Sequence, residues 1–144
     1  LLIDQLALQE SQIRVFLKEW KCSNQMIKEV QLIVHGLNLR KKQQLSALDL
    51  YQLGKEASLK VEELMVYFGE VPQLREVSEK YDQLCIKSMR ELAIDGKLLL
   101  AESSKPPGKW MSDALQFAEQ AVIEGKVANK ANELFFFLKQ NNVL

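Results

Sequence analysis

Histidine and cysteine, two of the side chains that most often bind zinc, are scarce in this sequence of 144 residues, which has one histidine and two cysteines. His35 cannot form a histidine metal site alone, and Cys22 and Cys85 lie far apart without a spacing typical of zinc binding. Because both cysteines lie among apolar helical positions, we expect buried free thiols and a reducing, cytoplasmic location.

Glycine and proline are also scarce, at six and three residues, and this favours long helices over a turn-rich β fold. The apolar runs are far shorter than a bilayer span, so we expect no membrane contact. Apolar residues recur every three or four positions, and no segment alternates strictly between apolar and polar. The sequence therefore predicts an all-α, multi-helical fold of about eight helices, in two small packed helical units with no β-sheet.

The turn from Gly69 to Pro72 is the best position for a boundary between two units. We predict that residues 1–69 form the first unit and residues 70–144 the second. The second unit is expected to open with a long helix over Pro72–Leu92, because proline fits the first turn of a helix. The pair Asp95-Gly96 then ends that helix, and Asp95 caps a short one after it.

Net charge is zero, with 19 basic and 19 acidic residues, whereas a dedicated nucleic-acid-binding domain is usually more basic. Any contact with RNA must therefore be local. The most basic window ends in three consecutive cations, Arg40, Lys41 and Lys42, at the C-terminal end of an expected helix. We predict an RNA contact there, and a solvated helix face is the alternative.

The segment Lys105–Trp110 holds two prolines and a glycine directly before an amphipathic helix that Gly125 is placed to end. Unpaired backbone N–H groups at such a helix start favour phosphate. We predict RNA-backbone contacts at this start and, secondarily, at the turn after the helix: Lys105, Gly108, Lys109, Lys126 and Lys130. A plain proline-glycine helix start with a buried Trp110 and solvated lysines is the alternative.

The last helix is expected to begin with Asn129 as its cap and to carry Phe135–Phe137. Three consecutive phenylalanines need burial on more than one face, or a partner.

No arrangement of residues predicts catalysis. Glu62-Glu63 and Asp113 have no carboxylate partner at a spacing typical of two-metal chemistry, and no phosphate-binding glycine-rich loop is present. We therefore predict neither a catalytic residue nor a metal site, and the residues by themselves indicate a helical binding or scaffolding unit.

Five short motifs, which follow one another along nearly the whole chain, carry a family resemblance. They read Phe16-Leu17-Lys18-Glu19-Trp20-Lys21-Cys22-Ser23-Asn24, Leu50-Tyr51-Gln52-Leu53-Gly54, Gly96-Lys97-Leu98-Leu99, Gly108-Lys109-Trp110 and Gly125-Lys126-Val127-Ala128-Asn129. In this order they resemble the body and tail of bacterial class II tRNA nucleotidyltransferases, the CCA-adding enzymes. One departure is Lys97, where that family often has aspartate.

The resemblance implies a division of labour in a longer enzyme. In that family a head carries the metal-binding carboxylates, a neck selects the nucleotide, and a helical body and tail hold the tRNA. Residues 1–69 would then be the C-terminal part of the body, near the acceptor stem, and residues 70–144 the tail, which reaches the tRNA elbow. The parent enzyme would use Mg²⁺, with CTP and ATP as substrates, and this chain would hold no cofactor.

The head and neck motifs of that family are absent, and the chain begins with Leu1 rather than methionine. We therefore expect a part of a longer protein, inactive alone. Two alternatives remain open: the corresponding region of a related poly(A) polymerase, and a helical protein–protein interaction module that docks through Trp110 and Phe135–Phe137.

Overall fold

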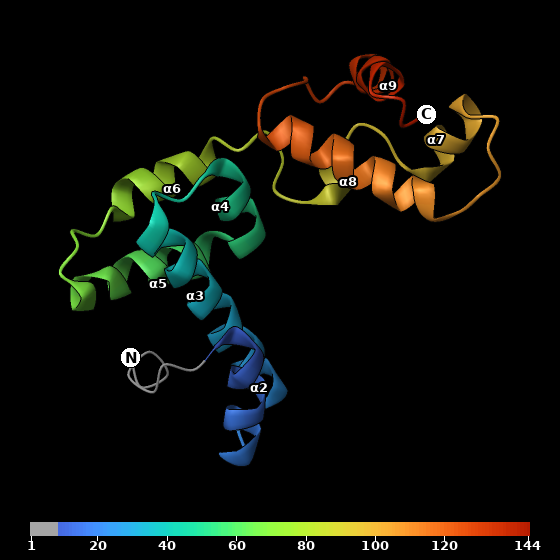
Figure 1. The fold of residues 1–144 in the computed structure, drawn as a ribbon. Helices are drawn as coiled ribbons and strands as arrows, with labels where there is room; N and C mark the ends of the chain where they lie inside the picture. Colours follow the sequence, from blue (N-terminus) through green and yellow to red (C-terminus); the bar gives the residue numbers. More distant parts are fainter. Residues whose placement is uncertain (1–8) are drawn as a thin grey trace. The chain divides into compact units, whose positions relative to one another are not determined.

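The computed structural model describes residues 9–144 and is helical, with no strand in this part of the chain. The eight α-helices of the described residues confirm the predicted all-α fold (Figure 1). They are α2 (Glu10–Glu19), α3 (Asn24–Lys42), α4 (Ala47–Leu53), α5 (Lys55–Met65), α6 (Leu74–Asp82), α7 (Gly96–Glu102), α8 (Lys109–Ile123) and α9 (Ala131–Gln140), with 3₁₀ turns η1 (Val66–Phe68) and η2 (Met89–Glu91). None of these helices is long and apolar enough to cross a membrane.

The chain divides after Asp82 into two compact units, which we call unit 1 (residues up to 82) and unit 2 (residues 83–144). This division lies later in the chain than the predicted boundary at Gly69–Pro72. The reason is that α6 packs with the helices before it, since Val77 of α6 shares a buried cluster with Leu37 of α3. The assignment of the two halves to a body and a tail stays a prediction.

The prediction of one long helix over Pro72–Leu92 is wrong, because α6 ends at Asp82. Residues 83–95 are irregular apart from η2. Leu92 and Ile94 in this segment are both buried, although two positions apart they would lie on opposite sides of a continuous helix. Burial of these side chains in unit 2 therefore overrides the helical pattern.

The two cysteines differ in exposure. Cys22 is half-buried against the α2–α3 cluster, whereas Cys85 is exposed, and both are free thiols. The expected burial of Cys85 is wrong because this residue lies in the irregular segment after α6 rather than on an apolar helix face.

Unit 1 is organised around the long helix α3, which packs against two sets of neighbours (Figure 1). The N-terminal half of α3 contributes Ile27 to a cluster with Ile13 and Leu17 of α2. Its C-terminal half contributes Leu37 to the larger cluster with α4, α5 and α6. One helix thus joins both cores of the unit.

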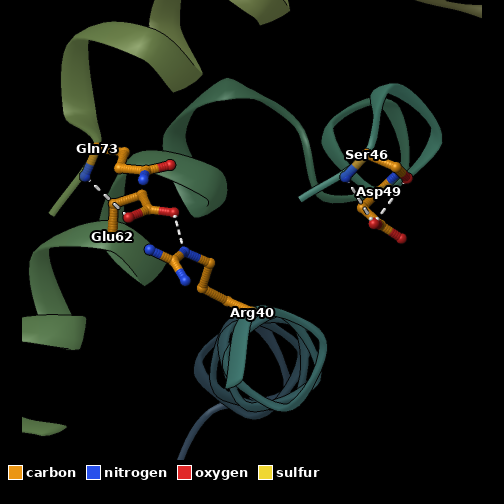
Figure 2. A network of polar contacts seen from close by, with 5 residues as sticks. All are labelled: Arg40, Ser46, Asp49, Glu62 and Gln73. Atoms are coloured by element: carbon orange, nitrogen blue, oxygen red, sulfur yellow. Dashed lines mark hydrogen bonds and ion pairs between the residues drawn. The ribbon is translucent and has the colours of Figure 1, made fainter. Parts of the chain in front are cut away.

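The helix ends of unit 1 follow the sequence closely. Ser23 caps α3, where its hydroxyl accepts a hydrogen bond from the Met26 backbone N–H at 3.2 Å. Ser46 caps α4 by a reciprocal pair of bonds with Asp49, which Figure 2 shows. Gly54 joins α4 to α5 with φ of +78°, a backbone region that glycine adopts without strain.

Unit 2 is built on α8, whose buried face consists mainly of small side chains. Ala114 and Ala118 are fully buried and Ala121 nearly so, and these short side chains let α7 and α9 approach α8 closely. Leu99 of α7 and Leu134 of α9 are fully buried. The predicted cap of α7 is confirmed, because the Asp95 carboxylate accepts a hydrogen bond from the Leu98 backbone N–H at 2.9 Å.

Gly125 ends α8 as predicted, with φ of +71°. The Lys126 N–H donates to the Ala121 carbonyl at 2.8 Å, and the Gly125 N–H donates to the Val122 carbonyl at 3.1 Å. These two bonds form a Schellman motif, which fixes the direction in which the chain leaves the helix.

Asn129 does not cap α9, so that prediction is wrong. The N-cap of α9 is Lys130, without a side-chain cap. The Asn129 amide instead accepts a hydrogen bond from the Ala93 N–H at 2.7 Å and donates one to the Glu91 carbonyl at 2.8 Å. It therefore ties the turn after α8 to the irregular segment around η2.

Candidate nucleic-acid interface

Arg40, one of the predicted RNA contacts, is buried, with 8% of its side chain exposed. Its Nε donates a hydrogen bond to Oε1 of Glu62 at 2.7 Å, and Glu62 is itself only 1% exposed. Figure 2 shows the guanidinium of α3 directed at this carboxylate of α5. Arg40 therefore serves packing of the helices, because a buried cation needs a partner inside the fold.

The second oxygen of Glu62 also has a partner. Oε2 accepts a hydrogen bond from the backbone N–H of Gln73 at 2.9 Å, immediately before α6 (Figure 2). One buried carboxylate thus links α3, α5 and the start of α6. The sequence contains this pair 22 positions apart, on different helices, so no local spacing identifies it.

Lys41 and Lys42 follow Arg40 and are exposed. The Lys41 ammonium lies 3.9 Å from the centre of the Phe68 ring, a cation–π contact. Both lysines line a hollow of about 400 Å³ beside Phe68 and Glu70. The basic segment therefore presents two cations at the surface rather than three.

Lys105 lies over the start of α8. Its ammonium is 5.6 Å from the centre of the Trp110 ring and donates a hydrogen bond to the Val143 carbonyl at 3.3 Å. Trp110 is half-buried, not buried, and its Nε1–H donates to the Pro106 carbonyl at 2.7 Å. The proline-rich loop is therefore closed onto α8 by the tryptophan, and Lys105 lies above this closure.

Gly108 is the N-cap of α8 and offers no side-chain cap. The Met111 N–H is paired with the Gly108 carbonyl at 3.1 Å, so the unpaired N–H groups at this helix start lie ahead of Met111. Lys109, the first residue of α8, is exposed. Lys105, Gly108 and Lys109 are thus brought together at one end of the helix.

Lys126 and Lys130 lie beyond the other end of α8, and each has an acidic neighbour. Lys126 pairs with Glu124, and Lys130 pairs with Glu133 at 3.2 Å. The hydrogen bond from Lys126, together with one from Gln120 at 2.8 Å, lowers the pKa of the Glu124 carboxyl. The two lysines are exposed, so the pairs compete with water and with any anion that approaches.

The predicted cations therefore form three separate groups. Two lie at opposite ends of the 15-residue helix α8, about 22 Å apart at a rise of about 1.5 Å per residue. The third, Lys41 and Lys42, belongs to unit 1. Across residues 9–144 no three histidine, cysteine, aspartate or glutamate side chains lie together in a way that could hold a metal ion.

The sequence did not single out Phe136 as different from its neighbours. Phe135 and Phe137 are half-buried, whereas Phe136 is 64% exposed. The helical period could have predicted this exposure. Leu134 and Leu138 are both fully buried, and Phe136 lies between these two positions on the opposite face of the helix.

Known proteins resemble this chain along nearly its whole length. Residues 1–138 match the family described as tRNA nucleotidyltransferase domain 2. The chain is 41% identical over 140 residues to the CCA-adding enzyme of Enterococcus faecalis (strain ATCC 700802 / V583), which covers 97% of this chain and 34% of that protein. It is 37% identical over 129 residues to the CCA-adding enzyme of Bacillus subtilis (strain 168), which covers 87% of this chain and 32% of that protein.

A solved structure agrees with the sequence matches. The crystal structure of the Bacillus stearothermophilus CCA-adding enzyme in complex with CTP superposes with a TM-score of 0.89 and 29% sequence identity. The match covers 98% of this chain and 36% of that one. The chain spans about a third of the length of the curated relatives it matches.

Proposed function

Because the chain belongs to the tRNA nucleotidyltransferase family, we propose that it is the tRNA-binding C-terminal body and tail of a CCA-adding enzyme. The observation that carries this proposal is the agreement of pattern and fold over 98% of the chain with one region of such an enzyme. The activity would be the maturation and repair of tRNA 3′ ends, performed by the whole enzyme.

In that activity this chain holds the tRNA through contacts with the phosphate backbone of the RNA. Folded RNA is recognised largely by shape and through phosphate and sugar, which suits lysines and helix starts rather than base-reading side chains. Lys105 and Lys109, beside the uncapped start of α8, form the primary phosphate contact. Lys126 and Lys130 form a secondary one, and Lys41 and Lys42 contribute from unit 1.

The existing ion pairs of Lys126 and Lys130 are compatible with this role. Both pairs are exposed at the surface, where such pairs contribute little to stability. A phosphate can therefore replace the carboxylate of Glu124 or Glu133 at small cost.

The remainder of the enzyme would supply the chemistry. We expect a head and a neck outside this chain to provide the metal-binding and nucleotide-selecting groups, with Mg²⁺ and with CTP and ATP as substrates. The tail residues of unit 2 would lie at the tRNA elbow, and unit 1 nearer the acceptor stem.

The test is binding of tRNA by the intact enzyme carrying Lys105→Ala and Lys109→Ala, measured across a salt series. Loss of two phosphate contacts should weaken binding and flatten the slope of log affinity against log salt by about one per charge. The matched control is Lys60→Ala with Lys80→Ala, two exposed lysines of unit 1 outside the three groups.

A folded Lys105/Lys109 double variant that keeps its affinity and its slope would contradict this contact. An intact wild-type enzyme that does not bind tRNA at all would contradict the function itself.

A further inference from the structure

Phe136 lies in the middle of the polar face of α9. The exposed residues one turn before it are Asn132 and Glu133, and those one turn after it are Lys139 and Gln140. Its ring is 64% exposed, more than any other large apolar side chain of unit 2 in the described residues. An aromatic ring surrounded by amides and charges has no part in the core of this helix.

The ring borders a hollow of about 450 Å³ between α9 and the turn after α8. This volume falls within the range of about 300–1,000 Å³ common for small-ligand sites. Phe136 and Phe137 supply its aromatic lining, and Asn132, Gln140 and Lys126 are the amides and the cation around it.

The surroundings of the hollow are held in place by the fold. Phe137 stacks on Phe117 of α8, with ring centres 5.4 Å apart and an angle of 18° between the planes. The Schellman motif at Gly125 fixes the turn that forms the opposite side. The aromatic surface is therefore arranged before any partner arrives, which reduces the entropy lost on binding.

We propose that Phe136 is a stacking platform for one nucleobase exposed in a loop region of the bound tRNA, with Asn132 and Gln140 near the edge of that base. This inference rests on the proposed function and adds a contact of a different chemistry to it. A base is flat and uncharged, and aromatic side chains bind it by stacking without regard to sequence. The surrounding amides can hydrogen-bond a base edge, whereas a protein partner would need a wider apolar surface.

Charge supports a base rather than a phosphate at this position. The lining of the hollow holds one ammonium group and one carboxylate, those of Lys126 and Glu133. The hollow therefore carries no excess of positive charge. Its main exposed apolar surface is the ring of Phe136.

The experiment is tRNA binding by the intact enzyme with Phe136 replaced by alanine, leucine, tyrosine or tryptophan, across the salt series used above. Phe136→Ala should weaken binding about tenfold, as loss of one stacked base does, and should leave the salt slope unchanged because no counterion is released. Phe136→Tyr and Phe136→Trp should bind as tightly as wild type, and Phe136→Leu should lose as much as alanine. Leu98→Ala, at an exposed apolar position on α7, is the matched control and should change nothing.

The outcomes separate this inference from the proposed function. Unchanged affinity in folded Phe136→Ala, while the Lys105/Lys109 variant loses affinity, removes the stacking platform and leaves tRNA binding intact. Full binding of tRNA by Phe136→Leu shows that the contact needs an apolar side chain but no aromatic ring, and it also overturns stacking. A wild-type enzyme that binds no tRNA overturns both.

Discussion

Unit 1 buries charge in its core, whereas unit 2 buries only apolar groups in the residues described. In unit 1 the buried polar side chains are Arg40, Ser58 and Glu62. In unit 2 the buried set is aliphatic, with alanines on α8 and leucines on α7 and α9. The polar link of unit 2, Asn129, is a half-buried amide that ties two loops.

This difference shows why charge density in a sequence is a poor measure of available surface charge. The most basic segment of the chain contributes one of its three consecutive cations to the core, because α3 turns Arg40 towards Glu62. The lysines of unit 2 are less concentrated in the sequence than Arg40–Lys42, but they lie at helix ends and turns, where they are not buried by packing between helices. The candidate RNA contacts therefore lie mainly where the chain changes direction.

Glu62→Ala should have the largest effect, because it leaves the Arg40 guanidinium buried without its carboxylate. We expect a loss of about 3–5 kcal/mol in the free energy of unfolding, as for other broken buried ion pairs. Hydrogen exchange should rise in α3, α5 and the start of α6, the three segments that Glu62 joins, and stay unchanged in α8 and α9. Urea denaturation with exchange measured by mass spectrometry checks both points.

The matched control in unit 1 is Glu79→Ala. Glu79 pairs with Arg75 at 2.8 Å on the exposed face of α6, so its loss should cost only about 0.3–0.5 kcal/mol. Equal losses from the two substitutions would mean that burial does not distinguish these ion pairs.

Asn129→Ala should have an intermediate effect, confined to unit 2. It removes two hydrogen bonds between the turn after α8 and the segment around η2, and at about 0.5–1.5 kcal/mol each we expect a loss of about 1–3 kcal/mol. The change should appear as faster hydrogen exchange at Ala93 and in the turn, with α3 and α5 unchanged. Asn132→Ala, an exposed amide on α9, is the control and should leave stability as it is. Faster exchange in unit 1 would show that the two units do not respond separately.

Glu124→Gln should have the smallest effect, which should be visible only in how the melting temperature depends on pH. The pKa of the Glu124 carboxyl is lowered from its ordinary 4.5 by its bonds with Lys126 and Gln120. Its contribution to stability is therefore present above pH 4.5 and is lost as the pH falls through the lowered value. The difference in melting temperature between neutral and acidic pH should shrink slightly in Glu124→Gln, and an increase would reverse the sign of this linkage.

Local signals in the sequence were sufficient for most of the helix ends. Asp95 caps a helix as predicted, Ser23 and Ser46 are serines in cap positions, and Gly54, Gly69 and Gly125 follow the ends of helical segments. Such signals involve residues within a few positions of each other, so they can be identified along the chain. The motifs that identified the family are largely of this kind, which explains how they could indicate a fold without containing any catalytic group.

The candidate site was less accessible to sequence reasoning. The start of α8, with Gly108 and Lys109, lies where the prolines and the glycine placed it. The exposure of Phe136 and the burial of Arg40 depend on which side of a helix meets another element. A charge pattern shows where a cation lies in the sequence. It does not show the partner of that cation, because the partner is distant in the chain.

The sequence by itself determined the helical class, most of the caps and turns, the family and the ends of α8, because each depends on residue type and short spacing. The tertiary structure alone decided that α6 stops at Asp82, that Arg40 is paired with Glu62, and that Asn129 bridges two loops. The last two outcomes depend on hydrogen bonds between residues 22 to 38 positions apart, and the first depends on burial of Leu92 and Ile94 in unit 2. In each case burial or hydrogen bonding outweighs local helical preference.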